Sequence, residues 1–164
     1  MTFKKETNMK YICPLITVTE IKRSREFYER VLSQTVKYDL GENVTFQGDF
    51  AIHLQSHYSQ LINNKPIRTG GNNFELYFEY DDIDEVVGRL KENHVEFVHE
   101  AREQPWRQKV VRVYDPDKNI IEIGESLEYL SYRLSNEGLS DEQISASVGI
   151  PIEFVKTSIA QFRK

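Results

Sequence analysis

The sequence contains a single cysteine, Cys13, among its 164 residues. One thiol excludes an internal disulfide framework and a cysteine-rich zinc module, because both need several cysteines. No apolar run reaches the roughly 18 residues of a membrane-spanning helix, and no glycine-rich phosphate-binding loop is present. The segment Met1–Lys10 is polar and lacks the apolar centre of a secretory signal. We therefore expect a cytoplasmic protein with no membrane partner.

Basic residues are also too few for a nucleic-acid-binding surface. The chain has 21 Lys and Arg against 26 Asp and Glu, a formal net charge of −5, whereas surfaces that bind phosphate backbones are net basic and clustered. No nucleic-acid partner is expected. Bulky apolar material is present, with 9 Phe, 9 Tyr and one Trp. A chain of this length can bury a core from such residues without disulfide or metal staples.

A strand, a helix and three further strands follow one another in the first half. Tyr11–Val18 is rich in β-branched residues and predicts a strand, which Pro14 places at a sheet edge because proline has no N–H for the ladder. Apolar pairs four residues apart predict a short amphipathic helix over Arg25–Leu32. The next strands are predicted around residues 35–38, 44–47 and 50–55, and residues 56–73 are predicted to form a polar loop.

The same order recurs in the second half. Phe74–Tyr80 alternates strictly between apolar and polar residues, which predicts a strand. Asp82, with Glu85 three residues later, has the form of a capping box, and the apolar residues that follow recur at helical spacing. Strands are then predicted over 95–99, 109–114 and 120–124.

The two halves also align in register, because Val18–Ile21 matches Tyr80–Ile83 at an offset of 62 residues. A repeat of this kind defines the architecture before any single motif does. The predicted fold class is α+β, with a flexible arm over residues 1–10, paired βαβββ modules over 11–56 and 73–125, and a helical C-terminal extension over 126–164. Each module has one helix for one sheet face, so the other face must meet the second module, a partner chain or a cavity.

Strand alternation places several polar residues on the face that the helices leave uncovered. These residues are His53 in the first half and Glu75, Tyr77, Glu79 and Glu122 in the second. An imidazole and two carboxylates suit a divalent transition-metal ion. A solvated sheet face, with glutamates directed to water, explains the same pattern, and alternation alone favours that simpler explanation.

Three stretches together form a specific combination. They are Ser24–Leu32 with the pattern S-x-x-F-Y-x-x-V-L, the strand-to-helix segment Phe78–Asp84, and Asp115–Glu122, which is similar to D-P-D-G-N-x-x-E. Over about residues 11–125 the chain thereby resembles the vicinal oxygen chelate superfamily, which includes glyoxalase I, bleomycin and fosfomycin resistance proteins and extradiol dioxygenases. The resemblance implies two βαβββ modules whose curled sheets form a cleft.

In that superfamily, metal ligands come from the first and fourth strands of each module. The resemblance carries this role to His53, Glu75 and Glu122, with a divalent Zn, Ni, Fe or Mn ion as the implied cofactor. At the remaining position Cys13 stands where metal-binding members usually have histidine. Glu75 and Glu122 are the catalytic candidates, one of them as a general base.

The loop Gln104–Gln108 resembles a Pro-Trp-Gly loop that borders the cavity in relatives. Trp106 and Gln108, together with Tyr77 from the polar strand face, are the substrate-binding candidates. A rim residue that packs the loop explains Trp106 equally well.

Two other turns depart from the family pattern. Ser33 replaces the glycine of the usual Leu-Gly turn after the first helix, and Lys118 stands at the glycine of the third motif. Lys118 or Asn119 must therefore adopt the strained turn geometry that glycine usually supplies.

The C-terminal extension begins with leucines at helical spacing, followed by two shorter helical segments between Ile144 and Ile159 with helix-turn-helix spacing. The segment in the position of a recognition helix opens Pro-Ile-Glu-Phe and offers few cations to bases. Packing against the modules or a partner subunit is therefore favoured over DNA binding.

Two function classes remain open. The first is a metal-dependent lyase, isomerase or dioxygenase acting on a small oxygen-bearing substrate. The second is a non-catalytic small-molecule binding or resistance protein that uses the same cleft without metal. The fold hosts both. We also expect a homodimer, because exposed sheet edges need covering and members of the superfamily often pair.

Overall fold

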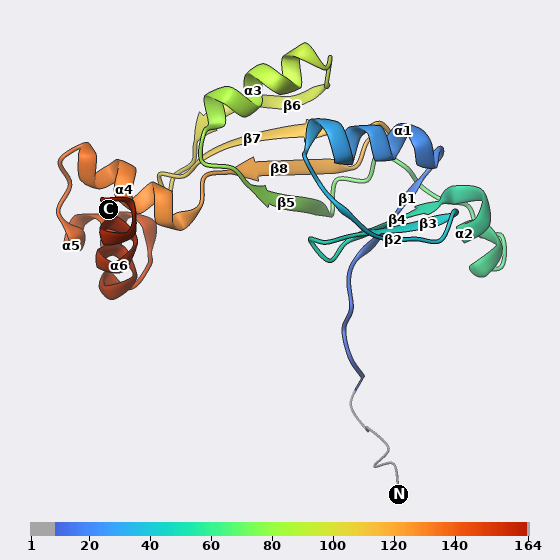
Figure 1. The fold of residues 1–164 in the computed structure, drawn as a ribbon, viewed down its shortest axis with the longest axis horizontal. Coiled ribbons are helices and arrows are strands. Elements are labelled where there is room, and N and C mark those ends of the chain that lie inside the picture. Colours follow the sequence, from blue (N-terminus) through green and yellow to red (C-terminus); the bar gives the residue numbers. More distant parts are fainter. Residues whose placement is uncertain (1–8, 164) are drawn as a thin grey trace, which may run out of the picture. The chain divides into compact units, whose positions relative to one another are not determined.

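The computed structural model describes residues 9–163, so the predicted arm lies outside the described residues up to residue 8. The described residues form two compact units, which meet in the sequence between Arg68 and Thr69. In the first unit, whose elements are labelled in Figure 1, the sheet has the order β1-β4-β3-β2, with β1 parallel to β4 and the other pairs antiparallel. Its elements are β1 (Leu15–Val18), α1 (Ile21–Arg25), its π-helical continuation η1 (Glu26–Val31), β2 (Val36–Asp39), β3 (Asn43–Phe46), β4 (Ala51–Leu54) and α2 (Gln55–Leu61).

Aromatic residues form the core of the first unit. The rings of Phe46 and Phe50 stack at 4.7 Å between centroids, and Tyr28 lies 5.2 Å from Phe50. Tyr28 reaches this core because the helix that follows β1 turns Phe27, Tyr28 and Val31 inward. The predicted amphipathic helix therefore covers one sheet face, although it begins at Ile21.

The prediction of a loop over residues 56–73 is wrong at its start, because α2 occupies Gln55–Leu61. None of its residues is buried. A helix that buries no apolar stripe leaves no helical period in the sequence. Hydropathy patterning could therefore not have found α2.

The second unit repeats the arrangement with the sheet order β5-β8-β7-β6. As predicted, the Asp82 side chain caps α3, since its Oδ1 accepts a hydrogen bond from the Glu85 N–H at 2.9 Å. The helix contacts β6 and β7. Its elements are β5 (Glu75–Glu79), α3 (Ile83–Glu92), β6 (Phe97–Glu103), β7 (Lys109–Tyr114) and β8 (Ile120–Gly124), followed by the helices α4 (Leu127–Asn136), α5 (Asp141–Val148) and α6 (Ile152–Phe162).

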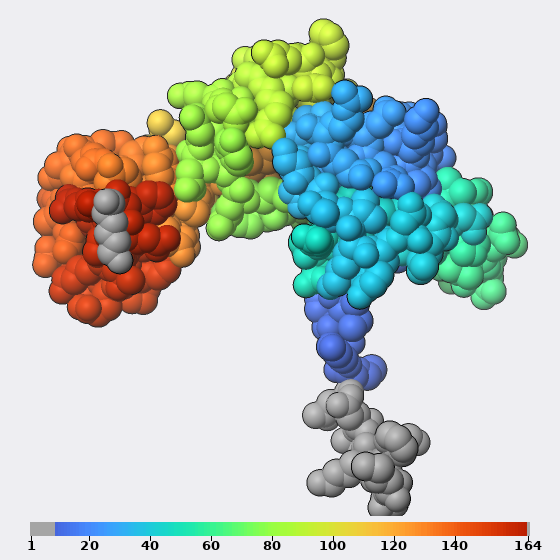
Figure 2. All heavy atoms as spheres, in the orientation of Figure 1, coloured from blue at the N-terminus to red at the C-terminus, as the bar shows by residue number. Residues whose placement is uncertain are grey.

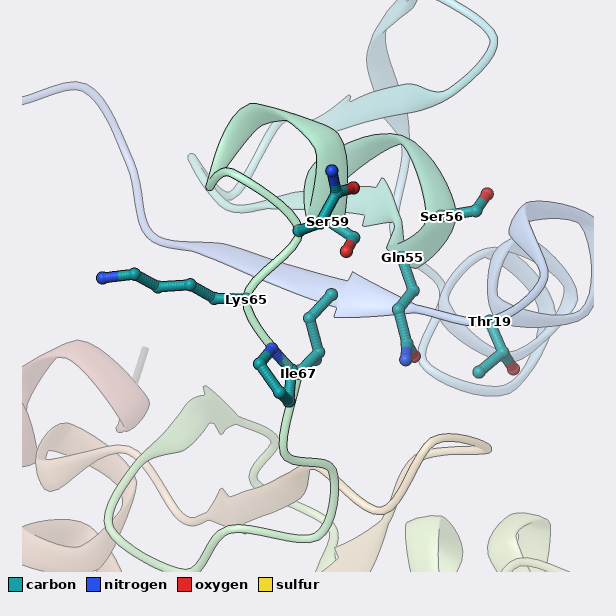
Figure 3. A pocket seen from close by; sticks show the side chains of 8 residues that line it. Thr19, Gln55, Ser56, Ser59, Lys65 and Ile67 are labelled. Carbon is teal, nitrogen blue, oxygen red and sulfur yellow. The ribbon is translucent and has the colours of Figure 1, made fainter.

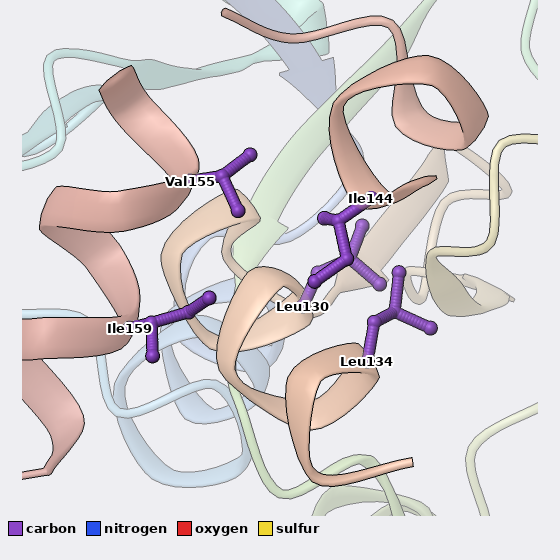
Figure 4. Packing of buried hydrophobic residues seen from close by; sticks show 5 residues of the cluster. All are labelled: Leu130, Leu134, Ile144, Val155 and Ile159. Atoms are coloured by element: carbon purple, nitrogen blue, oxygen red, sulfur yellow. The ribbon is translucent and has the colours of Figure 1, made fainter. Parts of the chain in front are cut away.

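The three C-terminal helices enclose a hydrophobic cluster of their own. Side chains from all three point toward one another (Figure 4), and together the helices form a compact body, orange to red in Figure 2. Ser140 and Gln143 form a capping box at the start of α5. The buried members of the cluster are Leu130, Leu134, Ile144, Val155 and Ile159. The two repeated sheets and the helical end confirm the predicted α+β class of paired βαβββ modules with a helical tail.

Three residues at family glycine positions adopt left-handed backbone geometry. They are Ser33 with φ 54°, Arg107 with φ 72° and Lys118 with φ 68°. Lys118, and not Asn119, takes the strained position of its turn. Each substitution leaves an L-residue where glycine would be free of the roughly 1–2 kcal/mol clash between Cβ and the following carbonyl.

Across residues 9–163, every helix is too short or too polar to cross a membrane.

Candidate functional site

A row of polar side chains crosses the second sheet. Strand register pairs Tyr77 of β5 with Glu122 of β8, and Glu122 with Arg112 of β7. Arg112 in turn pairs with His99 of β6. Residues paired in register share one face, and most of the buried apolar residues of these strands lie on the other face. The row therefore lies on the face that the sequence predicted to carry the site.

Arg112 joins the two glutamates that were predicted as metal ligands. Its Nε donates to Glu75 Oε2 at 2.9 Å and its Nη2 to Glu75 Oε1 at 3.4 Å. The same Nη2 forms an ion pair with Glu122 Oε2. The Glu122 side chain is 9% exposed, that of Arg112 22% and that of Glu75 39%. One guanidinium thus faces both carboxylates.

A divalent ion shared by these two carboxylates does not fit the arrangement as it stands. The guanidinium already contacts both groups, and a second cation beside it would be repelled by a like charge unless Arg112 moved away. His53, the third predicted ligand, belongs to the first unit. Taken separately, neither unit holds, within residues 9–163, three His, Cys, Asp or Glu side chains arranged to bind a metal.

Sequence reasoning missed Arg112, although a signal exists. Val111 and Val113 flank it and point to the helix-covered face, so alternation places Arg112 on the polar face. Its pairing with Glu122, however, depends on the register between β7 and β8, which alternation within one strand does not give.

The three predicted substrate-binding residues form a hydrogen-bonded chain. The indole Nε1–H of Trp106 donates to Gln108 Oε1 at 2.9 Å, and Gln108 Nε2 donates to the Tyr77 hydroxyl at 2.9 Å. Gln108 Nε2 also donates to the carbonyl oxygen of Glu125 at 2.6 Å. Gln108 is buried, whereas Trp106 and Tyr77 are 42% and 47% exposed. The chain therefore fixes two partly exposed aromatic rings through one buried amide.

Close packing at Gly124 brings the amide and the phenol together. A Cβ at this position would lie 3.0 Å from Gln108 Nε2 and 3.3 Å from Tyr77 Cε2, so a larger residue would require these side chains to shift by a few tenths of an ångström. Although Tyr77 is half-exposed as a residue, desolvation of its phenol raises its pKa to about 12, against the opposing effect of the Gln108 hydrogen bond. Tyr77 is therefore a neutral hydrogen-bonding group at ordinary pH.

His53 lies in a separate polar cluster of the first unit. Its Nε2 is 2.9 Å from Nδ1 of His57, and its Nδ1 is 3.2 Å from the Asn43 amide nitrogen. His57 Nδ1 is also 3.1 Å from Glu42 Oε2. Burial lowers the pKa of His53, the nearby His57 lowers it further, and Glu42 opposes both. The neutral form of the His53 imidazole is therefore favoured. His57 was not among the site residues predicted from the sequence, where its only indication is its position four residues after His53.

An open pocket lies beside α2 in the same unit (Figure 3), with a volume of about 390 Å³. Five of its eight lining residues carry a neutral hydroxyl or amide group. Lys65 extends away from the other labelled side chains (Figure 3). The lining residues are Thr19, Gln55, Ser56, Ser59, Asn64, Lys65, Pro66 and Ile67, none of which was predicted from the sequence.

Solved structures share this fold over most of their own length. A protein of unknown function from Agrobacterium tumefaciens is 36% identical, with a TM-score of 0.67 over 73% of this chain and 95% of that one. A glyoxalase/bleomycin resistance protein/dioxygenase superfamily member from Sphaerobacter thermophilus is 25% identical, with a TM-score of 0.58 over 72% and 98%. A lactoylglutathione lyase from Agrobacterium tumefaciens is 22% identical, with a TM-score of 0.56 over 73% and 96%.

Comparison with curated protein sequences gives no significant match. The family model of the glyoxalase-like domain, however, matches residues 11–128. This range includes both βαβββ modules and every residue predicted for the site. The chain therefore belongs to the glyoxalase-like family, within the vicinal oxygen chelate superfamily.

Proposed function

We propose that this chain is a small-molecule-binding protein whose ligand lies on the polar face of the second unit, without a resident metal between Glu75 and Glu122. The observation that carries this proposal is the pairing of Arg112 with both carboxylates. An internal guanidinium supplies the positive charge that a metal would otherwise supply. Cys13, in place of the histidine of metal-binding relatives, points the same way.

The side chains available on this face favour a small, flat ligand that carries oxygen. Trp106 and Tyr77 expose apolar ring surface on which a planar group can stack. The Tyr77 hydroxyl stays protonated, because its pKa is raised to about 12. It can therefore donate a hydrogen bond to a ligand oxygen in exchange for its bond to Glu79.

A metal-dependent lyase, isomerase or dioxygenase is the second candidate. It would use His53, Glu75 and Glu122 as ligands, with Glu75 or Glu122 as general base. The supporting observation is the lowered pKa of His53, since a metal ligand must be a neutral imidazole. This candidate requires Arg112 to release both carboxylates.

Metal analysis separates the two candidates. Protein purified without chelator should contain far less than one metal ion per chain, and titration with Mn²⁺, Zn²⁺ or Ni²⁺ should show no stoichiometric site. The Arg112→Met variant frees both carboxylates and should gain affinity for these ions, and Arg112→Met/Glu122→Gln should lose that gain. Stoichiometric metal in the wild type that disappears in both His53→Ala and Glu122→Gln would refute the metal-free proposal and favour the metal-dependent candidate instead.

Ligand binding can be followed through Trp106, the only tryptophan of the chain. We expect compounds from a library of planar, oxygen-bearing molecules to change its fluorescence, and Gln108→Ala to weaken the response. Compounds that bind without any change at Trp106 would place the ligand elsewhere, with the pocket beside α2 as the first alternative.

The proposed assembly is a homodimer. Each sheet has two edge strands within its own unit, β1 and β2 in one and β5 and β6 in the other, and such edges favour pairing with another chain. Sedimentation at micromolar concentration should give a dimer, and a monomer would refute this assignment.

A further inference from the structure

The helix α4 reaches back to the loop that carries Trp106 and Gln108. The glyoxalase-like domain ends at residue 128, so nearly all of α4 (Leu127–Asn136) lies beyond it. The Arg133 Nη2 donates to the carbonyl oxygen of Arg107 at 2.8 Å. This contact joins the C-terminal extension to the proposed ligand-binding loop.

Arg133 is the centre of a charged network. It binds Glu125 through Nε at 2.7 Å and through Nη2 at 3.0 Å, and Glu137 through Nη1 at 2.7 Å. Arg107 in turn pairs with Glu103 at 2.7 Å and with Glu137 at 3.3 Å. The Glu125 side chain is 1% exposed and that of Arg133 12%. Arg133 of α4 and Glu137, the residue that follows the helix, therefore hold the backbone and the side chain of Arg107 respectively.

Arg107 needs such support because of its backbone. Its φ of 72° is in the left-handed region, which an L-residue adopts only at a cost in free energy. Relatives with a Pro-Trp-Gly loop have glycine at this place and incur no such cost. In this chain the carbonyl contact from Arg133 and the ion pairs to Glu103 and Glu137 stabilise the strained turn.

Glu125 extends the same support to the substrate-binding amide. Its carboxylate accepts a hydrogen bond from the Lys109 N–H at 2.8 Å, and its carbonyl oxygen accepts one from Gln108 Nε2 at 2.6 Å. Gln108 then holds Trp106 and Tyr77. A continuous path of hydrogen bonds therefore runs from Arg133 through Glu125 and Gln108 to the exposed rings.

Other contacts already hold α4 in place. Its leucines belong to the hydrophobic cluster of the three helices. Ser126, at its start, donates through N–H and through its hydroxyl to Asp81 Oδ1, at 3.0 and 2.7 Å. The charged network is therefore additional to what anchors the helix.

We propose that α4 is a clamp on the ligand-binding loop and that Arg133 is a positioning residue which fixes Trp106 and Gln108 for the ligand. The relevance to binding rests on the proposed function, but the clamp itself is tested without any ligand. The probes are amide hydrogen exchange of residues 104–108 and quenching of Trp106 fluorescence by acrylamide.

The test compares Arg133→Met with a matched control. Arg133→Met keeps an aliphatic stem but removes every donor. The control, Arg163→Met, removes another cation that binds α4, through a 2.9 Å hydrogen bond to Ser135. In Arg133→Met, loop exchange should rise about tenfold, as expected for the loss of a charge-assisted hydrogen bond, and acrylamide should quench Trp106 more strongly. Arg163→Met should match the wild type in both measurements.

A second pair of variants keeps the test decisive if Arg133→Met folds poorly, because that change leaves Glu125 buried without its partner. Arg133→Met/Glu125→Gln removes the uncompensated charge and should still show the faster loop exchange. Adding Arg107→Gly should reduce the difference, since glycine needs no support at this φ. Unchanged loop exchange, or exchange that rises equally in α5 and α6, would overturn the clamp. Failure of the wild type to bind any small molecule would overturn the proposed function and leave the clamp result intact.

Discussion

Replacing Arg112 by methionine should destabilise the second unit, because two carboxylates lose their shared cation. Glu75 is 39% exposed, so its share follows surface ion pairs, at about 0–1 kcal/mol. Glu122 is only 9% exposed, and breaking a fully buried pair costs about 3–5 kcal/mol. Arg112 itself is 22% exposed, so water can reach the orphaned carboxylate, and we expect a total loss of about 2 kcal/mol.

The assay is urea unfolding at pH 7 followed by Trp106 fluorescence, which reports the second unit because this tryptophan lies there. Glu122→Gln should remove much of the penalty when combined with Arg112→Met, since an amide needs no counter-charge. A double-mutant cycle should therefore give a coupling energy of about 1 kcal/mol or more between Arg112 and Glu122. Glu75→Gln serves as the exposed control and should couple more weakly. Additive effects of Arg112→Met and Glu122→Gln, or a loss below about 0.5 kcal/mol for Arg112→Met, would refute the proposed neutralisation.

Four further outcomes are expected. The pKa of His53 is lowered in the folded state. Its contribution to stability is therefore complete above the unfolded pKa of about 6.5 and is lost as the pH falls below that value. Urea midpoints of the wild type should decline below this pH, and those of His53→Gln should decline less. The raised pKa of Tyr77, about 12, should appear in ultraviolet titration as a phenol that ionises after the exposed tyrosines and is absent in Tyr77→Phe. The contribution of the Tyr77 phenol to stability is complete below the unfolded pKa of about 10 and is lost as the pH rises toward 12. Leu134 is fully buried, so Leu134→Ala should cost about 2–5 kcal/mol in calorimetry, whereas a change within error would mean that the helices pack differently. Random duplex DNA should not retain the chain at physiological ionic strength, because residues 126–164 contain five acidic and four basic residues, a net charge of −1; salt-dependent retention would contradict this.

The repeat could be predicted from the sequence because each of its features depends on neighbouring residues and occurs in both halves. The offset of 62 residues, the cap at Asp82 and the alternation of Phe74–Tyr80 each depend on a few neighbouring residues. Side-chain period decides which face of a strand is polar. For this reason the predicted polar residues of the second unit lie on one face of its sheet.

Family glycine positions were equally informative. Lys118 stands where the third motif usually has glycine, and backbone geometry at a tight turn is set locally. The sequence therefore required a left-handed residue there, and Lys118 adopts it. Arg107 adopts the same left-handed geometry at the position where related proteins with a Pro-Trp-Gly loop have glycine.

Only the tertiary structure decided which charges meet. Arg112 faces Glu75 and Glu122 because of the register between three strands. A strand's own alternation fixes which face a residue occupies, but not which residue of the neighbouring strand lies opposite it. Arg133 meets Arg107 because a helix beyond the family domain folds back on a loop 26 residues earlier. The polar helix α2 left no period to read. The sequence thus determined the modules and their faces, whereas the pairing of charges across strands and segments, and with it the character of the site, arose from long-range packing.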